Sequence, residues 1–563
     1  MNKNTRYLFF VASIAASFAT FAQEDASRIQ KRFETTPEPK STLQPLVFPI
    51  NERTPPEEAG RIKFVLKSLT IKGNTAFSLE QLAPHYADYI GKEVTLLDVY
   101  KLRDAITAKY GNAGFGLSKA IIPEQRIQSD GLVQIDIIEG FVDEVILEGS
   151  TEGQQEFFAH ASEQIKSERP LNARTLERYL LLANDRFAIK VTSTLKSSEK
   201  TPAASTLILK IDQAPKLEGS GSLDNRGTQL VGPNQINLNT TINGLGNRAS
   251  QTAIGYATTS QTSELQYFSL GHTEIISQEG TSLNLGWVKS LSKPGSEYLR
   301  LLNNNSDSET WSLKLAHPII RTRQENLTVQ VRYDQQDTKS ETLDVLTMQD
   351  RIRALRLGLN YDNADSFNGV NQALIQYSYG IQGLGATDSN NLIKSRADGK
   401  AGFQKITANL SRTQELAAIS PLLSKFSIYT ALMGQYSPTG LLSSEECGIG
   451  GQQFGRAYNP SEIIGDSCLA GNLELRFTPS TEGTFFKYAQ FYGWYDGGTT
   501  TNHTPLSASD HATKSLSSTG LGVRYGMGGG VTGYIEAAQP ISRDVLAEGN
   551  KNPRFFASLS VRF

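Results

Sequence analysis

The chain has few of the residues on which metal centres, redox sites and disulfide scaffolds depend. Its 563 residues include only 2 cysteines and 6 histidines. Two cysteines cannot build a disulfide framework or a four-thiolate zinc site, although they can form one bond in an oxidising compartment. The histidines are scattered, and the sequence has no His-Glu-x-x-His helix, no Walker phosphate loop and no Gly-x-Ser-x-Gly elbow. We therefore expect no enzyme activity, no bound metal and no cofactor.

Charge of one sign and long apolar runs are also missing. The 55 basic residues nearly balance the 57 acidic residues, which leaves a net charge of -2. No overall positive field exists to attract nucleic acid, so we expect no nucleic-acid partner. No segment after residue 22 resembles the ~20 apolar residues of a membrane-spanning helix. If the protein enters a membrane, it does so with strands.

The N-terminus predicts export from the cytoplasm. Lys3 and Arg6 precede a mostly apolar run over 7–21, and small residues follow at the end of that run. This pattern is typical of a secretory signal peptide over residues 1–22, so we expect the mature chain to start near Gln23. A short charged helix is predicted over 23–35.

A proline-rich linker is predicted next, over residues 36–63. Six prolines stand between Pro37 and Pro56, which favours a stiff, extended tether. On composition alone, a disordered tail explains the same residues equally well.

Two similar modules are predicted after the linker, over residues 64–140 and 141–214. A strand over 65–71 ends at a Gly-Asn pair, and a strand over 142–147 ends at a Gly-Ser pair 76 residues later. In each module, helical spacing of apolar residues follows and then two alternating strands. Each module therefore reads β-α-α-β-β, a small α+β domain.

The remaining residues, 215–563, alternate between apolar and polar residues over many short runs. Leu355, Leu357 and Leu359 alternate with polar residues or glycine, and similar runs recur to the C-terminal Phe563. In lipid, every backbone polar group must be paired internally, so a sheet spans a membrane only as a closed barrel. At ~10 residues a strand, the segment has room for about sixteen antiparallel strands. The alternative is a secreted, soluble β-rich protein.

Several motifs resemble those of the two-partner-secretion outer-membrane transporters, the haemolysin secretion/activation family. "IKGNTAF" at 71–77, "IIPEQRI" at 121–127 and "IEGFVDEVILEGS" at 138–150 match its polypeptide-transport-associated (POTRA) domains, and "LDNRGT" at 223–228 matches its barrel opening. The resemblance covers essentially the whole mature chain. It implies a barrel in the bacterial outer membrane and two POTRA domains in the periplasm. It also implies that the helix over 23–35 plugs the barrel.

"GGQQFGRAYNPSEIIGD" at 450–466 is similar to the family's extracellular hairpin, which folds back into the barrel lumen. The resemblance implies a tip formed by Gly455, Arg456 and Tyr458. Ala457 stands where the family usually has glycine. Without the resemblance, Arg456 reads as an ordinary surface cation.

"WYDGG" at 494–498 resembles the family's strand motif that receives the hairpin, with Trp494, Asp496 and Gly498 as the receiving residues. We expect Arg456 and Asp496 to form a bidentate ion pair, because guanidinium and carboxylate groups match in geometry. We also expect Gly498 to leave space for the hairpin, and Trp494 and Tyr458 to pack around the pair.

The two cysteines are placed symmetrically about this tip. The midpoint of Cys447 and Cys468 falls at 457.5, so we expect them to face each other across the two arms of the hairpin. A disulfide there would restrict the hairpin; two unrelated thiols are the alternative. At the other end of the barrel sequence, Phe563 is predicted to act as the C-terminal assembly signal.

These features predict a translocator that exports a specific partner protein in unfolded form after the POTRA domains capture it. The partner would be an adhesin-, haemolysin- or toxin-like exoprotein. We also expect contact with outer-membrane lipids, the barrel-assembly machinery and periplasmic chaperones. Two other functions remain open: an insertase that folds other barrels, and a passive diffusion porin.

Overall fold

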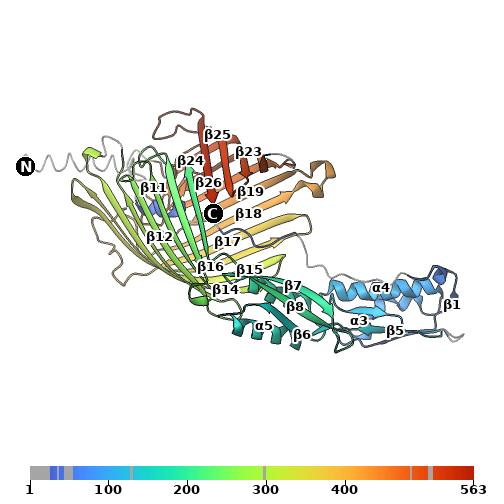
Figure 1. The fold of residues 1–563 in the computed structure, drawn as a ribbon. Helices are drawn as coiled ribbons and strands as arrows, with labels where there is room; N and C mark the ends of the chain where they lie inside the picture. Colours follow the sequence, from blue (N-terminus) through green and yellow to red (C-terminus); the bar gives the residue numbers. More distant parts are fainter. Residues whose placement is uncertain are drawn as a thin grey trace, which may run out of the picture.

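A computed structural model describes residues 26–33, 37–43, 55–126, 131–295, 300–481, 485–504 and 511–563. The predicted signal peptide at 1–22 lies outside the described residues. The described chain consists of a short helix with part of a linker, two small modules and a large closed barrel (Figure 1). Both modules lie at one end of the barrel, which we call the module end. The opposite end is called the far end.

The first module contains a three-stranded sheet with the order β2-β5-β4 and a small pair, β1-β3. Its elements are η1 Glu57–Gly60, β1 Lys63–Val65, β2 Ser68–Lys72, α3 Leu79–Leu82, η2 Ala83–His85, η3 Ala87–Tyr89, β3 Glu93–Thr95, α4 Leu96–Asn112, β4 Lys119–Ile121 and β5 Leu132–Ile138. The single strand predicted over 65–71 is wrong, because the chain changes partners there. Leu66 donates its N–H to the Lys92 carbonyl, whereas Lys67 donates to the Gly131 carbonyl.

A partly buried carboxylate, that of Glu139, explains why two of the first module's motifs occur together. Glu139 accepts hydrogen bonds from the backbone N–H groups of Thr75 and Ala76, at 2.7 and 2.8 Å, and from the Tyr110 hydroxyl at 2.8 Å. Burial alone would raise the pKa of Glu139, but these donors hold it below its ordinary value. The glutamate therefore ties the loop after β2 to helix α4.

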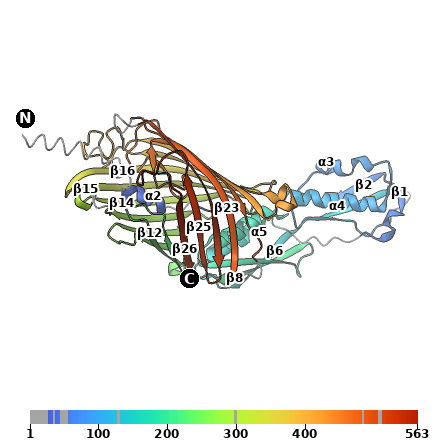
Figure 2. The same ribbon diagram turned by 90° about the horizontal axis from the view of Figure 1, so that it is seen from above.

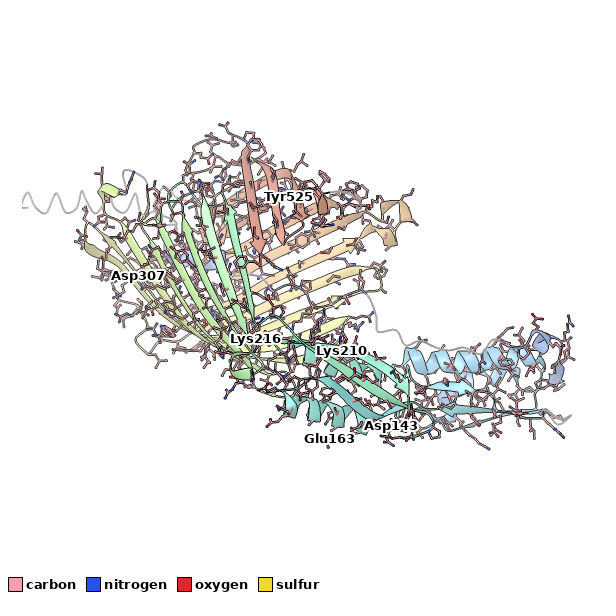
Figure 3. The ribbon with its side chains drawn as sticks, in the orientation of Figure 1. Asp143, Glu163, Lys210, Lys216, Asp307 and Tyr525 are labelled. Atoms are coloured by element: carbon pink, nitrogen blue, oxygen red, sulfur yellow. A yellow bond between two sulfur atoms is a disulfide. The ribbon has the colours of Figure 1, made fainter. Side chains whose placement is uncertain are left out.

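The second module repeats the arrangement with a sheet of order β6-β8-β7. Its elements are β6 Phe141–Gly149, α5 Gln155–Ser167, α6 Ala173–Asp185, β7 Ile189–Ser197 and β8 Ala204–Gln213. Both helices contribute to one apolar core with the sheet, including Phe157, Phe158, Leu180 and Leu207. Lys216 then stands between β8 and the first barrel strand (Figure 3).

The first module meets the second through backbone contacts, which we call the first joint. Gly140 donates its N–H to the Ser118 hydroxyl at 3.1 Å and accepts from the Leu171 N–H at 3.0 Å. Ala173, at the start of α6, donates to the Gly114 carbonyl at 2.7 Å. Leu117 packs against the apolar core of the second module.

The second module meets the module end of the barrel chiefly through charged side chains, which we call the second joint. Glu279, in the turn after β12, lies 2.8 Å from Arg178, 2.6 Å from the Tyr179 hydroxyl and 2.9 Å from His160. At the end of β14, Arg321 donates to both oxygens of Asp185, at 2.7 and 3.0 Å.

The barrel is closed and antiparallel, and it has sixteen strands. They are β9 Leu217–Asp224, β10 Gln235–Asn243, β11 Ser250–Thr259, β12 Leu265–Ile275, β13 Ser282–Ser292, β14 Asn305–Arg321, β15 Glu325–Thr342, β16 Val345–Ala364, β17 Gly369–Gly380, β18 Gln404–Glu415, β19 Phe426–Tyr436, β22 Ser467–Phe477, β23 Phe486–Thr501, β24 Thr513–Met527, β25 Val531–Pro540 and β26 Arg554–Arg562. Three 3-10 turns lie at the strand connections: η4 Leu245–Asn247, η5 Leu416–Ala418 and η6 Pro421–Leu423. The predicted mainly β fold, with its barrel and two α+β modules, is confirmed.

Alternation along the strands separates an apolar outer face from a polar lumen. Leu355, Leu357 and Leu359 of β16 are exposed on the outside, whereas Arg356 points inward and binds Glu445 at 2.7 Å. The seam between β26 and β9 closes the barrel. There Phe563 exchanges backbone hydrogen bonds with Gly219, at 2.8 and 3.0 Å, and its proposed role as an assembly signal stays a prediction.

Candidate functional site: a hairpin and a helix inside the barrel

The connection between β19 and β22 returns into the barrel. Because β9 leaves from the module end and strand direction alternates, β19 runs toward the far end, where residues 437–466 begin. This loop forms a two-stranded hairpin, β20 Cys447–Ile449 and β21 Ile463–Gly465. Its tip residues Arg456, Ala457 and Tyr458 are at most 5% exposed. The tip therefore lies buried in the lumen.

Backbone conformation at the tip depends on glycine. Gly450, Gly451 and Gly455 all adopt positive φ, at 127°, 99° and 70°, where residues with a side chain are strained. A Cβ on Gly455 would also lie 2.7 Å from Leu516 of β24. Ala457 is not among the described residues with positive φ, so an alanine fits where the family usually has glycine.

The Arg456 guanidinium lies closest to Glu474, and its ion pair with the predicted Asp496 is longer. Its Nη1 donates to Glu474 Oε2 at 2.6 Å, whereas Nε lies 3.8 Å from Asp496 Oδ2. The guanidinium carbon lies 4.8 Å from the centre of the Trp494 ring. The expected contact with Trp494 is present, but the bidentate pair with Asp496 is wrong. Glutamate, with one more methylene, reaches the guanidinium.

Asp496 instead fixes the backbone of the tip. Its Oδ2 accepts the backbone N–H of Arg456 at 3.1 Å, and its Oδ1 accepts the Ser518 hydroxyl at 2.5 Å. Both oxygens are therefore already used by neutral donors. Asp496 positions the residue that carries the guanidinium, and Glu474 receives its charge.

The lumen contains further arginines around this pair. Glu474 also accepts from Arg476 at 2.7 Å and from Arg524 at 2.7 and 3.0 Å. Arg226 donates to the Arg456 carbonyl at 2.8 Å and pairs with Glu536. Four guanidinium groups therefore share three carboxylates: those of Arg226, Arg456, Arg476 and Arg524 on one side, and those of Glu474, Asp496 and Glu536 on the other. The loss of one carboxylate leaves buried positive charge uncompensated.

Sequence reasoning missed Glu474, Glu536 and the role of Arg226. Arg226 was visible as part of "LDNRGT", but it contacts the hairpin only because the barrel brings β9 and β25 to the same side. Glu474 stands in an alternating run, between the inward-facing polar residues Asn472 and Arg476. No local signal distinguishes it from its neighbours.

Tyr458 and Gly498 both lie where the hairpin meets strands β23 and β24. The Tyr458 hydroxyl is 3.2 Å from the Ser517 carbonyl and 3.1 Å from the Arg543 carbonyl, so it does not pack around the ion pair as expected. A Cβ on Gly498 would lie 2.7 Å from Cδ1 of Ile449 in the hairpin. The glycine therefore allows the hairpin to approach the wall closely.

The two cysteines are joined in a disulfide. Cys447 belongs to the hairpin strand β20, but Cys468 belongs to the barrel strand β22. They face each other as expected, but the expectation that both stand on arms of the hairpin is wrong. The bond ties one arm of the hairpin to the barrel wall, because β21 ends at Gly465 and the wall resumes at Ser467.

Helix α2, Ala26–Phe33, also lies inside the barrel, against β13 and β14 (Figure 2). Arg28 Nη2 lies 2.8 Å from Glu446 Oε2, and Lys31 Nζ donates to the Glu446 carbonyl at 2.7 Å. Ile29 is fully buried. The prediction that Arg28, Lys31 and Arg32 face a polar lumen agrees with the lumen cavity they line.

The linker residues 37–43 run along the inner edge of the module end. The Pro37 carbonyl accepts from Gln372 of β17 at 2.7 Å, and the Ser41 N–H donates to Asp362 of β16 at 2.8 Å. Lys40 lies 3.1 Å from Asp185 of the second module. The linker thus passes between the barrel and the second joint.

Among the described residues, no cluster of three or more histidine, cysteine, aspartate or glutamate side chains has the arrangement of a metal site. In the same part of the chain, no helix is both long and apolar enough to cross a membrane.

Comparison with known proteins places this arrangement in a family. The model for the haemolysin secretion/activation protein ShlB/FhaC/HecB matches residues 203–525, and the model for the ShlB-type POTRA domain matches residues 64–140. The heme/hemopexin transporter protein HuxB of Haemophilus influenzae is 23% identical over 86% of this chain and 85% of its own. The outer membrane transporter CdiB of Dickeya dadantii is 23% identical over 78% of this chain and 77% of its own.

Solved structures show the same fold. The structure of CdiB from Escherichia coli superposes with a TM-score of 0.70 at 18% identity and covers 98% of both chains. The family model alone covers more than half of the chain. The chain therefore belongs to the ShlB/FhaC/HecB haemolysin secretion/activation family of outer-membrane proteins.

Proposed function

We propose that this protein exports a partner protein, in unfolded form, through its barrel and across the outer membrane. The barrel lies in the outer membrane, and the POTRA modules lie in the periplasm. The observation that carries the proposal is the content of the lumen, in which a folded-back hairpin and an N-terminal helix stand in one cavity. A simple diffusion pore needs neither.

The barrel can accommodate an extended chain once its movable contents leave. The cavity beside α2 has a volume of about 600 Å³ and is bordered by polar side chains from the helix, the hairpin and the wall. Helix α2 is held there by polar contacts with the hairpin and the wall and by the buried Ile29, without a covalent bond to either. It therefore acts as a plug that leaves when the partner arrives.

The modules supply the capture step. In the second module, β6 and β7 are the outer strands of the sheet, so within the described part of the chain each has one side without a strand partner. An extended partner can add to such an edge through main-chain hydrogen bonds. This mode of binding suits an unfolded exoprotein, because the edge strand bonds to the partner's main chain and depends little on its side chains. No step in this scheme needs an enzyme activity or a cofactor.

Similar proteins support the transport function. HuxB is described as a heme/hemopexin transporter protein, and CdiB is described as an outer membrane transporter. For this chain we infer a secreted exoprotein as the partner. Outer-membrane lipids surround the barrel, and the barrel-assembly machinery and periplasmic chaperones bring it there.

Deletion of the gene tests the proposal. We expect one secreted protein to disappear from the culture medium, measured by mass spectrometry, and to return when the intact gene is supplied in trans. Loss of many outer-membrane barrels would instead identify an insertase. Reduced solute uptake with unchanged secretion would identify a porin.

Variants of the hairpin site test how export depends on it. We expect Arg456→Ala, Asp496→Ala and Glu474→Gln each to impair secretion while the barrel still inserts, as judged by heat-modifiable migration in gels. Removal of either partner of the buried Arg456–Glu474 pair costs about 3–5 kcal/mol. Lys200→Gln, in an exposed ion pair of the second module, is the control. Normal secretion from all three hairpin variants would remove the proposed role of the site.

A further inference from the structure

The cavity beside the hairpin tip, which we call the tip cavity, is bordered mainly by cations. Its volume is about 310 Å³, and its charged lining consists of four arginines and one glutamate: Arg226, Arg456, Arg476, Arg524 and Glu536. Glu474 and Asp496 pair with these arginines but do not border the cavity, and they are 0% and 1% exposed. We propose that the tip cavity binds carboxylate groups of the exported polypeptide as that chain enters the lumen. This inference rests on the proposed export function.

The tip cavity lies in the half of the lumen that faces the modules. Strands β22 and β24 both run toward the module end. Arg476 stands one residue before the end of β22, and Arg524 stands three residues before the end of β24. A polypeptide that enters from the periplasm therefore reaches these arginines before it passes the hairpin.

The arginines have more donors than their shared carboxylate can accept. Glu474 accepts four hydrogen bonds, from Arg456 at 2.6 Å, from Arg476 at 2.7 Å and from Arg524 at 2.7 and 3.0 Å. A carboxylate has about four acceptor sites, whereas each guanidinium carries five N–H donors. Within the described part of the chain, Arg456 Nε is buried without a hydrogen-bond partner.

Arg476 has the donors that an entering carboxylate needs. Its side chain is 19% exposed, and among the described residues it donates a hydrogen bond only through Nε, to Glu474. Its two terminal nitrogens therefore remain for a ligand. Two parallel N–H groups of one guanidinium match the two oxygens of a carboxylate in geometry.

Aromatic rings hold two of the guanidinium groups in place. The guanidinium carbon of Arg476 lies 4.3 Å from the centre of the Tyr429 ring, and that of Arg524 lies 3.8 Å from the centre of the Tyr492 ring. Both tyrosines border the tip cavity. Stacking of this kind fixes the plane of a guanidinium and leaves its edge for a hydrogen-bond acceptor. The site is therefore formed before a ligand arrives, which lowers the cost of binding.

The cavity beside α2 has the same excess of cations. Its charged lining consists of four cations and one carboxylate: Arg28, Lys31, Arg32, Arg226 and Asp224. The chain as a whole carries a net charge of -2, so this excess is local to the lumen. Cavities lined by one sign of charge attract the opposite sign. Acidic segments of a partner are therefore drawn into the lumen, and basic segments are repelled.

Binding of short peptides tests the inference without the exported protein. Full-length protein in neutral detergent micelles is titrated into fluorescently labelled hexaglutamate, hexaglutamine or hexalysine, and fluorescence anisotropy measures the bound fraction. We expect hexaglutamate to bind on the order of tenfold more tightly than hexaglutamine, the ratio that about 1.4 kcal/mol of binding free energy produces. Hexalysine should bind least. Added salt should reduce the preference for hexaglutamate, because salt screens charge.

Variants locate the binding in the tip cavity. The preference for hexaglutamate should be lost in Arg476→Gln, Arg524→Gln, whereas Arg476→Lys, Arg524→Lys keeps both charges and should retain part of it. Lys425→Gln removes an exposed cation at the same end of the barrel and is the control, with the preference unchanged. Heat-modifiable migration in gels shows that each barrel is folded. If the glutamine variant does not fold, the wild-type comparison of the three peptides and the lysine variant still decide the inference.

Three results would overturn the inference: equal binding of the three peptides by the wild type, a preference for hexaglutamate that survives in Arg476→Gln, Arg524→Gln, or a preference that is also lost in Lys425→Gln. Inorganic phosphate distinguishes two sources of the same chemistry. Displacement of hexaglutamate by an equal concentration of phosphate would identify a free oxyanion as the ligand and overturn the assignment to a polypeptide. The peptide measurements decide this inference and deletion of the gene decides the export function, so a failure of either is seen separately.

Discussion

The two joints of the periplasmic arm use different chemistry. At the first joint, Gly140 and Leu171 are joined through backbone atoms, and Leu117 enters the core of the second module. At the second joint, the barrel turns are held mainly by the carboxylates and cations around Glu279 and Asp185. Backbone groups packed this closely cannot exchange their hydrogen-bond partners while the two modules stay together. Charged side chains at a surface can exchange their partners with water.

From this difference we expect the two modules to move as one body and to bend at the barrel. A rigid arm transmits a force on the first module to the second joint, where Lys40 of the linker also binds Asp185. Movement at that joint therefore reaches the linker that leads to α2. The predictions below test each joint, and each uses spin labels on introduced cysteines, because the described chain has no free cysteine of its own.

Gly140→Val should produce the largest effect, at the first joint. A Cβ there would lie 2.3 Å from the Leu117 carbonyl oxygen, so backbone must shift, at a cost of about 3 kcal/mol. We expect the distance between labels at Asp88→Cys and Glu163→Cys to change from one narrow distribution to a broad one. An unchanged narrow distribution would show that the close approach at Gly140 is not what makes the first joint rigid.

Asp185→Ala should have a smaller effect, confined to the second joint. It removes a bidentate partner of the nearly buried Arg321, and hydrogen bonds to charged groups are worth about 1.5–3 kcal/mol. Labels at Glu163→Cys on the second module and Leu422→Cys at the module end should report a broader distance distribution. Labels at Asp88→Cys and Glu163→Cys should not. Broadening of both pairs would contradict the separation of the two joints.

The joints also show how much of the structure could be predicted from the sequence. The β-α-α-β-β order of each module and the strands of the barrel follow from periodicity, because each strand's apolar residues share one face. Neither joint was predicted. Gly140 looks like any glycine between two strands, and Glu279 is an ordinary turn residue until the barrel closes and brings it to α6.

The hairpin site shows the same limit. Its motifs located Arg456 and Asp496 in one place, since a buried guanidinium needs a carboxylate nearby. They did not identify Glu474, because Glu474 and Asp496 stand on neighbouring strands two register positions apart, and which of them reaches the guanidinium depends on the length of the side chain. The spacing of Cys447 and Cys468 placed the cysteines together. It could not show where the hairpin ends and the wall begins.

Acid should loosen the second joint before the first. Burial alone would raise the pKa of Glu279, but hydrogen bonds from Tyr179, His160 and Arg178 lower it to about 2. Because this pKa lies below the ordinary value of 4.5, the contribution of Glu279 to docking is complete above about pH 4.5 and declines as the pH falls toward 2. Labels at Glu163→Cys and Leu422→Cys should report this loss.

Glu279→Gln supplies the control for this pH dependence. It should remove most of the dependence and give at pH 7 part of the broadening that the wild type shows in acid. If the variant follows the same pH profile as the wild type, another group controls the joint. In the first joint, the contacts of Gly140, Leu171 and Ala173 are made by backbone groups that do not titrate, so its label distances should change less over the same range.

The smallest effect is expected for an ion pair that belongs to neither joint. Lys200 and Glu144 lie 2.7 Å apart in the second module, but their side chains are 69% and 39% exposed. Water and salt screen such a pair, so Lys200→Gln should leave both label distances unchanged and secretion normal. Since this variant removes one charge from the same module as Asp185→Ala, it separates the loss of a specific contact from a change in net charge. A broader distance distribution at the second joint in Lys200→Gln would mean that the overall electrostatic field of the module holds the arm. The contrast between two chemically different joints would then disappear.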